Sequence, residues 1–210
     1  MRISAMQAVV VAVGVTLAAA SVSAQAVSNT KGFYFGAAAN FTSLELDNAD
    51  IPDSERESGP GATLHLGYNF MPNIGVFLSG TGASIKPNDG EDIVIVGHSD
   101  AGLRFSLSAT TMFVPYAEAA YTYIRATGDS DGEEIELSGS GFTGAVGFNF
   151  FMTPKLALDV NGRYTNGEFN TVKIGGVSIS DQDGVGVTTM RLNVGIAFYP
   201  GMGGSQSMRR

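Results

Sequence analysis

The sequence predicts an all-β fold, a closed eight-stranded antiparallel up-and-down transmembrane β-barrel. Three observations support this fold class. Apolar side chains alternate with small or polar ones in many segments, while helical periodicity is absent after Ala26. Short, nearly uncharged turns alternate with longer acidic connections. Beyond the N-terminal region no uncharged apolar run reaches the roughly 20 residues of a transmembrane helix, whereas barrel strands give only weak alternating signals.

The composition narrows the chemistry open to the chain. Its 210 residues include no Cys, which excludes a disulfide framework, a cysteine-based zinc site and a thiol nucleophile. Asp and Glu number 20 against 12 Lys and Arg, which gives a net charge of −8. Because binding to a phosphate backbone requires a basic surface, we expect no nucleic-acid partner. The length suits a single domain.

The N-terminus predicts a secretory signal peptide. Arg2 supplies the positive start, 8–20 is apolar, and small residues lead up to Ala24. We predict cleavage after Ala24, with Ala26 as the alternative position. An anchoring helix is the competing interpretation, and the short apolar run disfavours it. The predicted division of the chain is 1–24 as signal peptide, 25–199 as barrel domain and 200–210 as a short flexible tail.

Eight segments carry the strand pattern. The second alternates Leu, Leu, Tyr and Phe with polar or small residues over 64–70. The seventh and eighth repeat this alternation over 156–164 and 190–198. The other segments are delimited by the turns and acidic connections around them. In chain order the predicted strands are 32–46, 61–70, 73–84, 92–107, 112–126, 137–151, 155–168 and 186–199.

Two kinds of connection join these segments. Tight turns at 71–73, 108–111 and 152–154 carry almost no charge, whereas the longer connections hold 14 of the 20 acidic residues. Short turns in the periplasm and long loops outside the cell are typical of an outer-membrane barrel. We therefore expect acidic extracellular loops. They are 47–60, 85–91, 127–136 and 169–185, with Asp47, Asp50, Asp53, Asp89, Glu91, Asp129, Asp131, Glu133, Glu134, Asp181 and Asp183 among their acids.

The side chains of the predicted strands indicate which face meets lipid. Leu64, Leu66 and Tyr68 share one face of their segment, and small or polar residues occupy the other. An eight-stranded barrel is narrow inside, so we expect the small residues to point inward and the bulky ones outward. A secreted β-sandwich with an aromatic core is the alternative, but it does not explain the alternation of turns and loops. The predicted inward small residues are Gly36, Gly67, Ala120, Ala145, Gly147, Gly195 and Ala197. The predicted aromatic girdles contain Phe33, Phe41, Tyr68, Phe70, Phe113, Tyr121, Tyr123, Phe148, Phe150, Phe151, Tyr164, Phe198 and Tyr199.

Six charged residues lie within the predicted strands, in phase with the small and polar positions. A charge on the lipid face costs about 2–4 kcal/mol near mid-bilayer, so we expect these groups inside the barrel as an ion network. Filling of the interior is the favoured role, and a gated ion path is the alternative. The residues are Asp100, Arg104, Glu118, Asp159, Arg163 and Arg191.

Four phrases of the sequence, taken in order, resemble the OmpA/OmpX-like superfamily of outer-membrane barrels. They are GFYFGA at 32–37, GYNFMPNI at 67–74, VPYAEAAY at 114–121 and GAVGFNF at 144–150. The resemblance implies an eight-stranded barrel in the outer membrane of a Gram-negative bacterium. It also implies a C-terminal aromatic signal, read by the barrel-assembly machinery, which 193–198 matches. The tail that follows is a departure from the pattern and is too short for a peptidoglycan-binding domain.

Two further chemistries deserve a test. A lipid-modifying enzyme would use His98, which shares a strand face with Asp100 and which we place towards the outer end, within reach of a lipid headgroup. The acidic loops match no calcium-binding motif, so we expect no metal site, although weak Mg²⁺ or Ca²⁺ accumulation at the rim is a hypothesis. No cofactor is expected, and His65 is interpreted as an interior histidine.

These inferences predict a structural or surface-interacting membrane protein that acts through its acidic loops. A small-solute or ion pore and a lipid-modifying enzyme are the alternatives. The expected partners are outer-membrane lipid, lipopolysaccharide, the barrel-assembly machinery and an unidentified host or cell-surface molecule.

Overall fold

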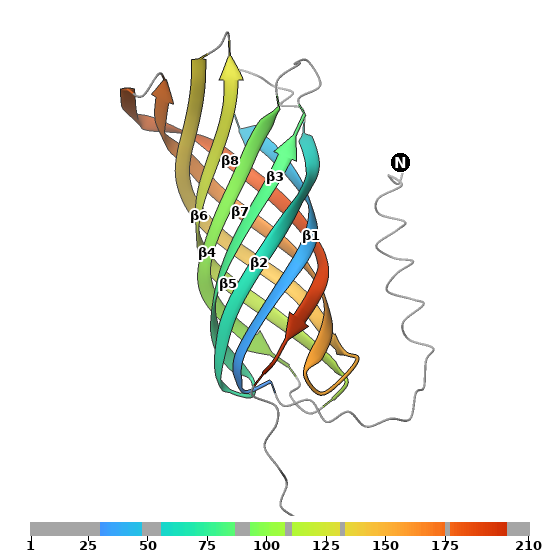
Figure 1. Cartoon of the computed structure of the whole chain (residues 1–210). Helices are drawn as coiled ribbons and strands as arrows, with labels where there is room; N and C mark the ends of the chain where they lie inside the picture. Colours follow the sequence, from blue (N-terminus) through green and yellow to red (C-terminus); the bar gives the residue numbers. More distant parts are fainter. Residues whose placement is uncertain are drawn as a thin grey trace, which may run out of the picture.

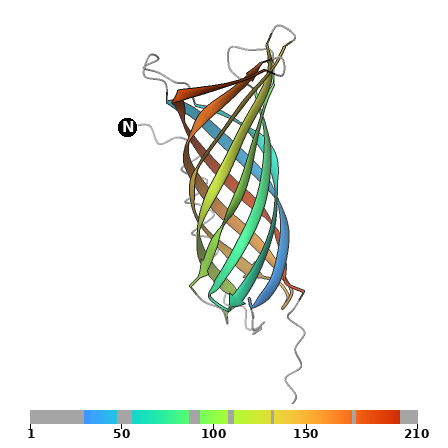
Figure 2. The ribbon, with the colours of Figure 1, turned by 90° about the vertical axis from the view of Figure 1, so that its left-hand side faces the viewer.

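The computed structural model describes residues 30–47, 56–86, 93–107, 111–130, 133–174 and 177–200. Within these ranges the chain forms one closed barrel, in which neighbours in sequence pair antiparallel and β1 pairs with β8 (Figures 1 and 2). The predicted fold class is confirmed. The strands are β1 (Gly32–Asp47), β2 (Glu57–Met71), β3 (Ile74–Ile85), β4 (Val94–Ser106), β5 (Phe113–Ser130), β6 (Glu133–Phe151), β7 (Leu156–Ile174) and β8 (Val177–Phe198).

The barrel has two unlike ends. At one end, here called the turn end, β1 begins, β8 finishes, and short connections join β2 to β3, β4 to β5 and β6 to β7 (Figure 1). The opposite end, the loop end, carries the other four connections. In the described part of the chain, no helix has the length and hydropathy needed to cross a membrane. The predicted signal peptide at 1–24 and residues 201–210 of the predicted tail lie outside the described residues.

The two faces of the strands have opposite character. Large apolar side chains such as Leu64 (66% exposed) and Leu66 (50%) cover the exterior, while Arg163 and Arg191 are buried inside. This confirms the predicted inside-out arrangement. A surface of this kind is stable in hydrocarbon, where a closed barrel leaves no backbone polar group unpaired.

Exposed aromatic side chains form two groups on the exterior, one at the turn end and one near the middle of the strands. Phe33, Phe70 and Phe113 belong to the first group, and Tyr121 and Tyr164 to the second. Two residues assigned to these girdles were placed on the wrong face. Phe151 and Tyr199 are only 0% and 1% exposed, because both are in phase with the interior positions, and their rings pack 5.2 Å apart inside the turn end.

Two predicted loops are largely strand. Ser130 pairs with Glu133 and Ile174 pairs with Val177, so 127–136 and 169–185 continue the β5–β6 and β7–β8 hairpins. A two-residue connection favours this outcome, since it lets the backbone ladder continue to the tip. Asp129, Glu133, Glu134, Asp181 and Asp183 therefore lie on strands, and Asp47 is the last residue of β1. Asp50, Asp53, Asp89, Glu91 and Asp131 lie outside the described residues.

The extended hairpins rise beyond the closed part of the barrel at the loop end (Figure 1). The pairing of β1 with β8 stops at Asp47 and Gly186, and that of β4 with β5 stops at Ile95 and Thr127. Above this level β5 to β8 form an open four-stranded sheet. Register shifts at Ser138/Gly139 and Phe169/Thr171 accompany the change, as expected where bulges bend strands at the rim of a barrel.

Candidate functional site in the barrel interior

The interior is filled in three layers. An aromatic layer lies at the turn end and an apolar layer at the loop end, with charged and polar side chains between them. Within the described residues, side chains thus occupy the barrel from one end to the other, as expected for eight strands. The aromatic layer comprises Tyr34, Phe77, Val114, Ala120, Phe151, Ala157, Ala197 and Tyr199. The apolar layer comprises Leu44, Ile85, Val96, Ile124, Ala126, Phe169 and Val187.

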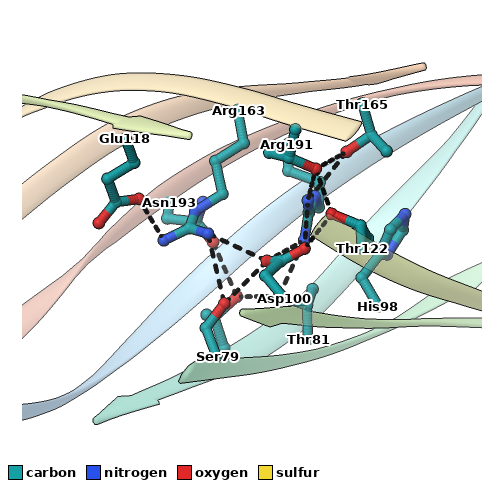
Figure 3. Close-up of polar contacts among 12 residues, drawn as sticks. Ser79, Thr81, His98, Asp100, Glu118, Thr122, Arg163, Thr165, Arg191 and Asn193 are labelled. Atoms are coloured by element: carbon teal, nitrogen blue, oxygen red, sulfur yellow. Dashed lines mark hydrogen bonds and ion pairs between the residues drawn. The ribbon is translucent and has the colours of Figure 1, made fainter. Parts of the chain in front are cut away.

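Five of the six charged residues selected from the sequence form one chain of ion pairs, the ionic layer. Arg104 Nη2 lies 2.6 Å from Glu118 Oε1, and Glu118 Oε2 lies 2.8 Å from Arg163 Nη2. Asp100 Oδ2 lies 3.0 Å from both Arg163 Nη1 and Arg191 Nη1. The residues come from β4, β5, β7 and β8, so the chain ties together strands on different sides of the barrel (Figure 3).

Asp100 is the centre of this layer. Its two carboxylate oxygens accept hydrogen bonds from Ser79 Oγ and Thr122 Oγ1, both at 2.8 Å. They also accept bonds from Arg163 at 3.0 Å and from both terminal nitrogens of Arg191 at 3.0 and 3.1 Å (Figure 3). A buried carboxylate is stable when it is paired and fully hydrogen-bonded in this way.

Arg104 joins the ionic layer to the aromatic layer. Its guanidinium carbon lies 4.0 Å from the ring centroid of Tyr116 and 4.7 Å from that of Tyr34. Glu118 therefore neutralises the arginine from one direction while two rings cover its faces, an arrangement that stabilises a desolvated cation. A Cβ on Gly67 would collide with the Tyr34 ring, so the neighbouring strand needs glycine at this position.

Asp159 is the member of the predicted set that forms no ion pair with another described residue. Its carboxylate accepts hydrogen bonds from Tyr116 Oη at 3.0 and 2.9 Å and from Asn161 Nδ2 at 2.7 Å. Tyr116 thus donates a hydrogen bond to Asp159 and stacks on the Arg104 guanidinium. This neutral side chain connects the two charged groups. The expected balance of three acids with three arginines is present in the interior but not as three direct pairs.

Hydroxyl and amide groups extend the ionic layer around the barrel wall. Thr122, Thr143 and Thr165, on consecutive strands, are linked by Oγ1–Oγ1 contacts of 2.5 and 2.7 Å. On the opposite side, Asn193 accepts from Thr63 at 2.8 Å and donates to Asn161 at 2.8 Å. The result is a continuous polar belt that fixes the relative heights of the strands.

Sequence reasoning missed the aromatic layer and the apolar layer inside the barrel. The sequence does contain a signal for the apolar layer. It is the alternation that puts Ile85, Val96 and Ile124 in phase with the inward-facing small and polar residues. The expectation of small interior residues holds at Ala145, which is buried, and at Gly67, where a Cβ would collide with the Tyr34 ring. At the ends, the ionic layer gives way to side chains that exclude water.

His98 does not lie where a lipid headgroup could reach it, and that expectation is wrong. Its side chain is 2% exposed and turned into the barrel, because position 98 is in phase with Asp100 on β4. Its Nε2 lies 3.1 Å from Thr189 Oγ1, while the arginines and hydroxyl groups already described occupy Asp100. His65 is also buried inside, with its ring 5.9 Å from that of Tyr34.

Among the residues that the structure describes, no three His, Asp or Glu side chains are grouped so as to hold a metal ion. The charged interior is instead held by arginine, which supplies the cations that carboxylates need.

Comparison with known proteins agrees with this architecture. The family model described as "Outer membrane protein beta-barrel domain" matches residues 12–198. A comparison with curated protein sequences gives no match. Among solved structures, Neisserial surface protein A (NspA) is 16% identical, with a TM-score of 0.58 over 80% of this chain and 97% of that one. OprG from Pseudomonas aeruginosa is 15% identical, with a TM-score of 0.56 over 81% and 97%. AlkL, solved in lipid bilayers, is 16% identical, with a TM-score of 0.51 over 85% and 95%. At these identities the likeness is one of fold.

Proposed function

Because the chain belongs to the outer membrane protein beta-barrel domain family, we propose that it is a non-conducting membrane anchor that presents its loop-end hairpins at the cell surface. The family places the protein in the outer membrane of a Gram-negative bacterium. The proposal adds an orientation, with the loop end outside and the turn end in the periplasm, and a role in surface interaction without catalysis.

The filled interior is the observation that carries the proposal. Ions crossing the barrel would have to displace the aromatic layer, break the ionic layer and then wet the apolar layer. Phe151 and Ile124, one from each outer layer, are both 0% exposed. A barrel filled in this way is a packed core rather than a pore.

The loop-end hairpins support the interaction role. The open sheet above the closed barrel has free backbone edges, and acidic residues such as Asp129 and Glu134 lie on its strands. Binding residues are often carried on peripheral segments held by a rigid scaffold, and the belted barrel provides such a scaffold. The expected partner is a cell-surface or host molecule that contacts this acidic sheet.

A planar bilayer measurement tests the closed interior. Purified, folded protein should give no stable single-channel steps at neutral pH, since no layer opens without repacking. Reproducible steps from the wild-type barrel, absent from a sample left unfolded, would support an ion pore instead.

Cysteine labelling tests the orientation. The chain contains no Cys, so a single introduced thiol gives an unambiguous signal with a membrane-impermeant maleimide. Lys86→Cys lies beside the loop end of β3, and Lys155→Cys lies in the β6–β7 turn. Intact cells should label Lys86→Cys alone, and permeabilised cells should label both variants. Labelling of Lys155→Cys alone on intact cells would reverse the assignment.

A further inference from the structure

A groove lies on the lipid-facing surface, in the loop-end half of β2 to β5. It encloses about 590 Å³ and is lined on the exterior by Leu64, Gly80, Gly97, Ser99, Tyr123 and Arg125. A Cβ added to Gly80 would meet nothing within 4 Å, so the floor of the groove is bare backbone open to the surroundings. Leu64 and Tyr123, both exposed, form its walls.

This groove interrupts the group of exposed aromatic side chains near the middle of the strands. That group contains Phe41 on β1, Tyr121 on β5, Phe142 on β6 and Tyr164 on β7. On β3 and β4 the corresponding exterior positions are glycine and serine. A lipid chain can therefore approach the backbone here more closely than elsewhere at this level, because contact is limited by backbone atoms instead of rings.

An ion-pair cluster of two cations and one carboxylate lies at the rim of the groove. Arg125 Nε and Lys173 Nζ lie 3.4 and 3.3 Å from the same oxygen, Glu136 Oε1. Two exposed cations thus share one carboxylate. The Arg125 guanidinium also lies 6.0 Å from the ring centroid of Tyr123, so the cation is next to the groove wall.

The other exposed arginine at this end provides a contrast. Among the described residues Arg56 pairs with Glu45, at 2.6 Å, and it lines a larger depression of about 850 Å³ over β1, β2 and β6 to β8. Its charge is balanced by one partner. Among the exposed ion pairs of the described residues, the Arg125 cluster is the one in which two cations beside a groove share a single carboxylate. This gives Arg125 charge complementarity to an anionic lipid.

We propose that the groove binds lipid A, the phosphorylated membrane anchor of lipopolysaccharide. An acyl chain lies on the floor formed by Gly80 and Gly97, and a phosphate of the same molecule pairs with Arg125. Arginine matches phosphate through several directed donors, and Glu136 competes for that guanidinium when lipid is absent. The assignment to the outer leaflet rests on the proposed orientation, in which the loop end faces outward.

Native mass spectrometry of the folded protein in detergent tests the site, with diphosphorylated lipid A as the probe. Arg125→Gln should weaken binding about tenfold, the effect of losing one strong charge-assisted contact. Glu136→Gln should strengthen binding because it frees the guanidinium. Gly80→Leu fills an open space and should fold normally while reducing occupancy. Arg56→Gln is the matched control and should leave the affinity within about twofold, since that charge is already balanced.

Three outcomes would overturn the assignment. Equal losses for Arg125→Gln and Arg56→Gln would indicate general surface charge. Unchanged binding by a folded Gly80→Leu variant would separate the lipid from the groove. Equal affinity for phosphatidylglycerol would assign the site to anionic phospholipid. Because binding in detergent does not depend on orientation in the cell, a reversed labelling pattern would refute the proposed function without altering these affinities.

Discussion

Replacing Asp100 with asparagine gives the most direct test of the ionic layer. The substitution keeps the shape of the side chain but removes the one negative charge that lies within 3.0 Å of both Arg163 and Arg191. It also replaces an oxygen with an NH₂ group, so guanidinium donors on that side would face another donor. The hydroxyl bonds from Ser79 and Thr122 compete for the single oxygen that remains.

The magnitude follows from burial of these groups. All three charged side chains are at most 1% exposed, so water cannot replace the missing partner. Removing one member of a buried pair costs about 3–5 kcal/mol, because the other charge stays desolvated. We therefore expect Asp100→Asn to lower the free energy of unfolding by about that amount, which is two to nearly four powers of ten in the folding equilibrium at about 1.4 kcal/mol each.

Urea titration of the barrel in phospholipid vesicles measures this loss. The folded fraction can be read from the different gel mobilities of folded and unfolded barrels in unheated samples. The double variant Asp100→Asn/Arg191→Met removes one unpaired cation, so its loss should be smaller than the sum of the single losses by more than about 1 kcal/mol. A loss below about 1 kcal/mol for Asp100→Asn, or strict additivity, would show that the ionic layer does not stabilise the barrel.

Three other predictions follow from the same structure. Gly102→Ala should lower the free energy of unfolding by about 1–3 kcal/mol, because its Cβ would approach Ala120 Cα to 2.7 Å. At the lipid-facing Gly162 an added Cβ meets nothing within 4 Å, so Gly162→Ala should leave the free energy of unfolding unchanged in the same titration. Leu66→Arg should destabilise the barrel in vesicles by about 2–4 kcal/mol, while Ser58→Arg near the loop end should cost about 0–1; equal losses would contradict the placement of the apolar band. Asp100→Asn should remain without conductance in planar bilayers, because the aromatic and apolar layers stay in place, and channel steps from the folded variant would show that the ionic layer alone closes the barrel.

The strand pattern was sufficient to predict the closed barrel and its orientation of faces. Alternation determines which side chains share a face, and the narrow interior of eight strands decides which face can hold leucine and which needs glycine or alanine. The same reasoning selected Arg163 and Arg191 as interior residues, and the structure places both there. The structure also shows that Asp100 binds both arginines. The alternation within each strand could not predict this contact, because it does not tell which residues of different strands meet.

The remaining features depend on register and on side-chain length. Tyr199 and Phe151 were assigned to a lipid-facing girdle because aromatic residues near strand ends have that preference, but their phase turns them inward. Polar residues such as Asp181 predict a loop over 169–185, but the backbone ladder between β7 and β8 continues to Ile174 and Val177. In both cases the pairing with neighbouring strands decided the outcome, and a single sequence does not contain it directly.

The seam between β1 and β8 constrains how the cylinder can be made. Phe35, near the beginning of the first strand, pairs with Phe198 at the end of the last one, so the final hydrogen-bonded ladder requires nearly the whole chain to be present. Until β1 pairs with β8, the backbone N–H and C=O groups at both edges of the sheet lack hydrogen-bond partners, and lipid cannot replace water as a partner for them. We therefore expect integration into the bilayer to follow, and not to accompany, synthesis and export. An assembly factor that binds the two free edge strands would act at this late step, just before the barrel closes.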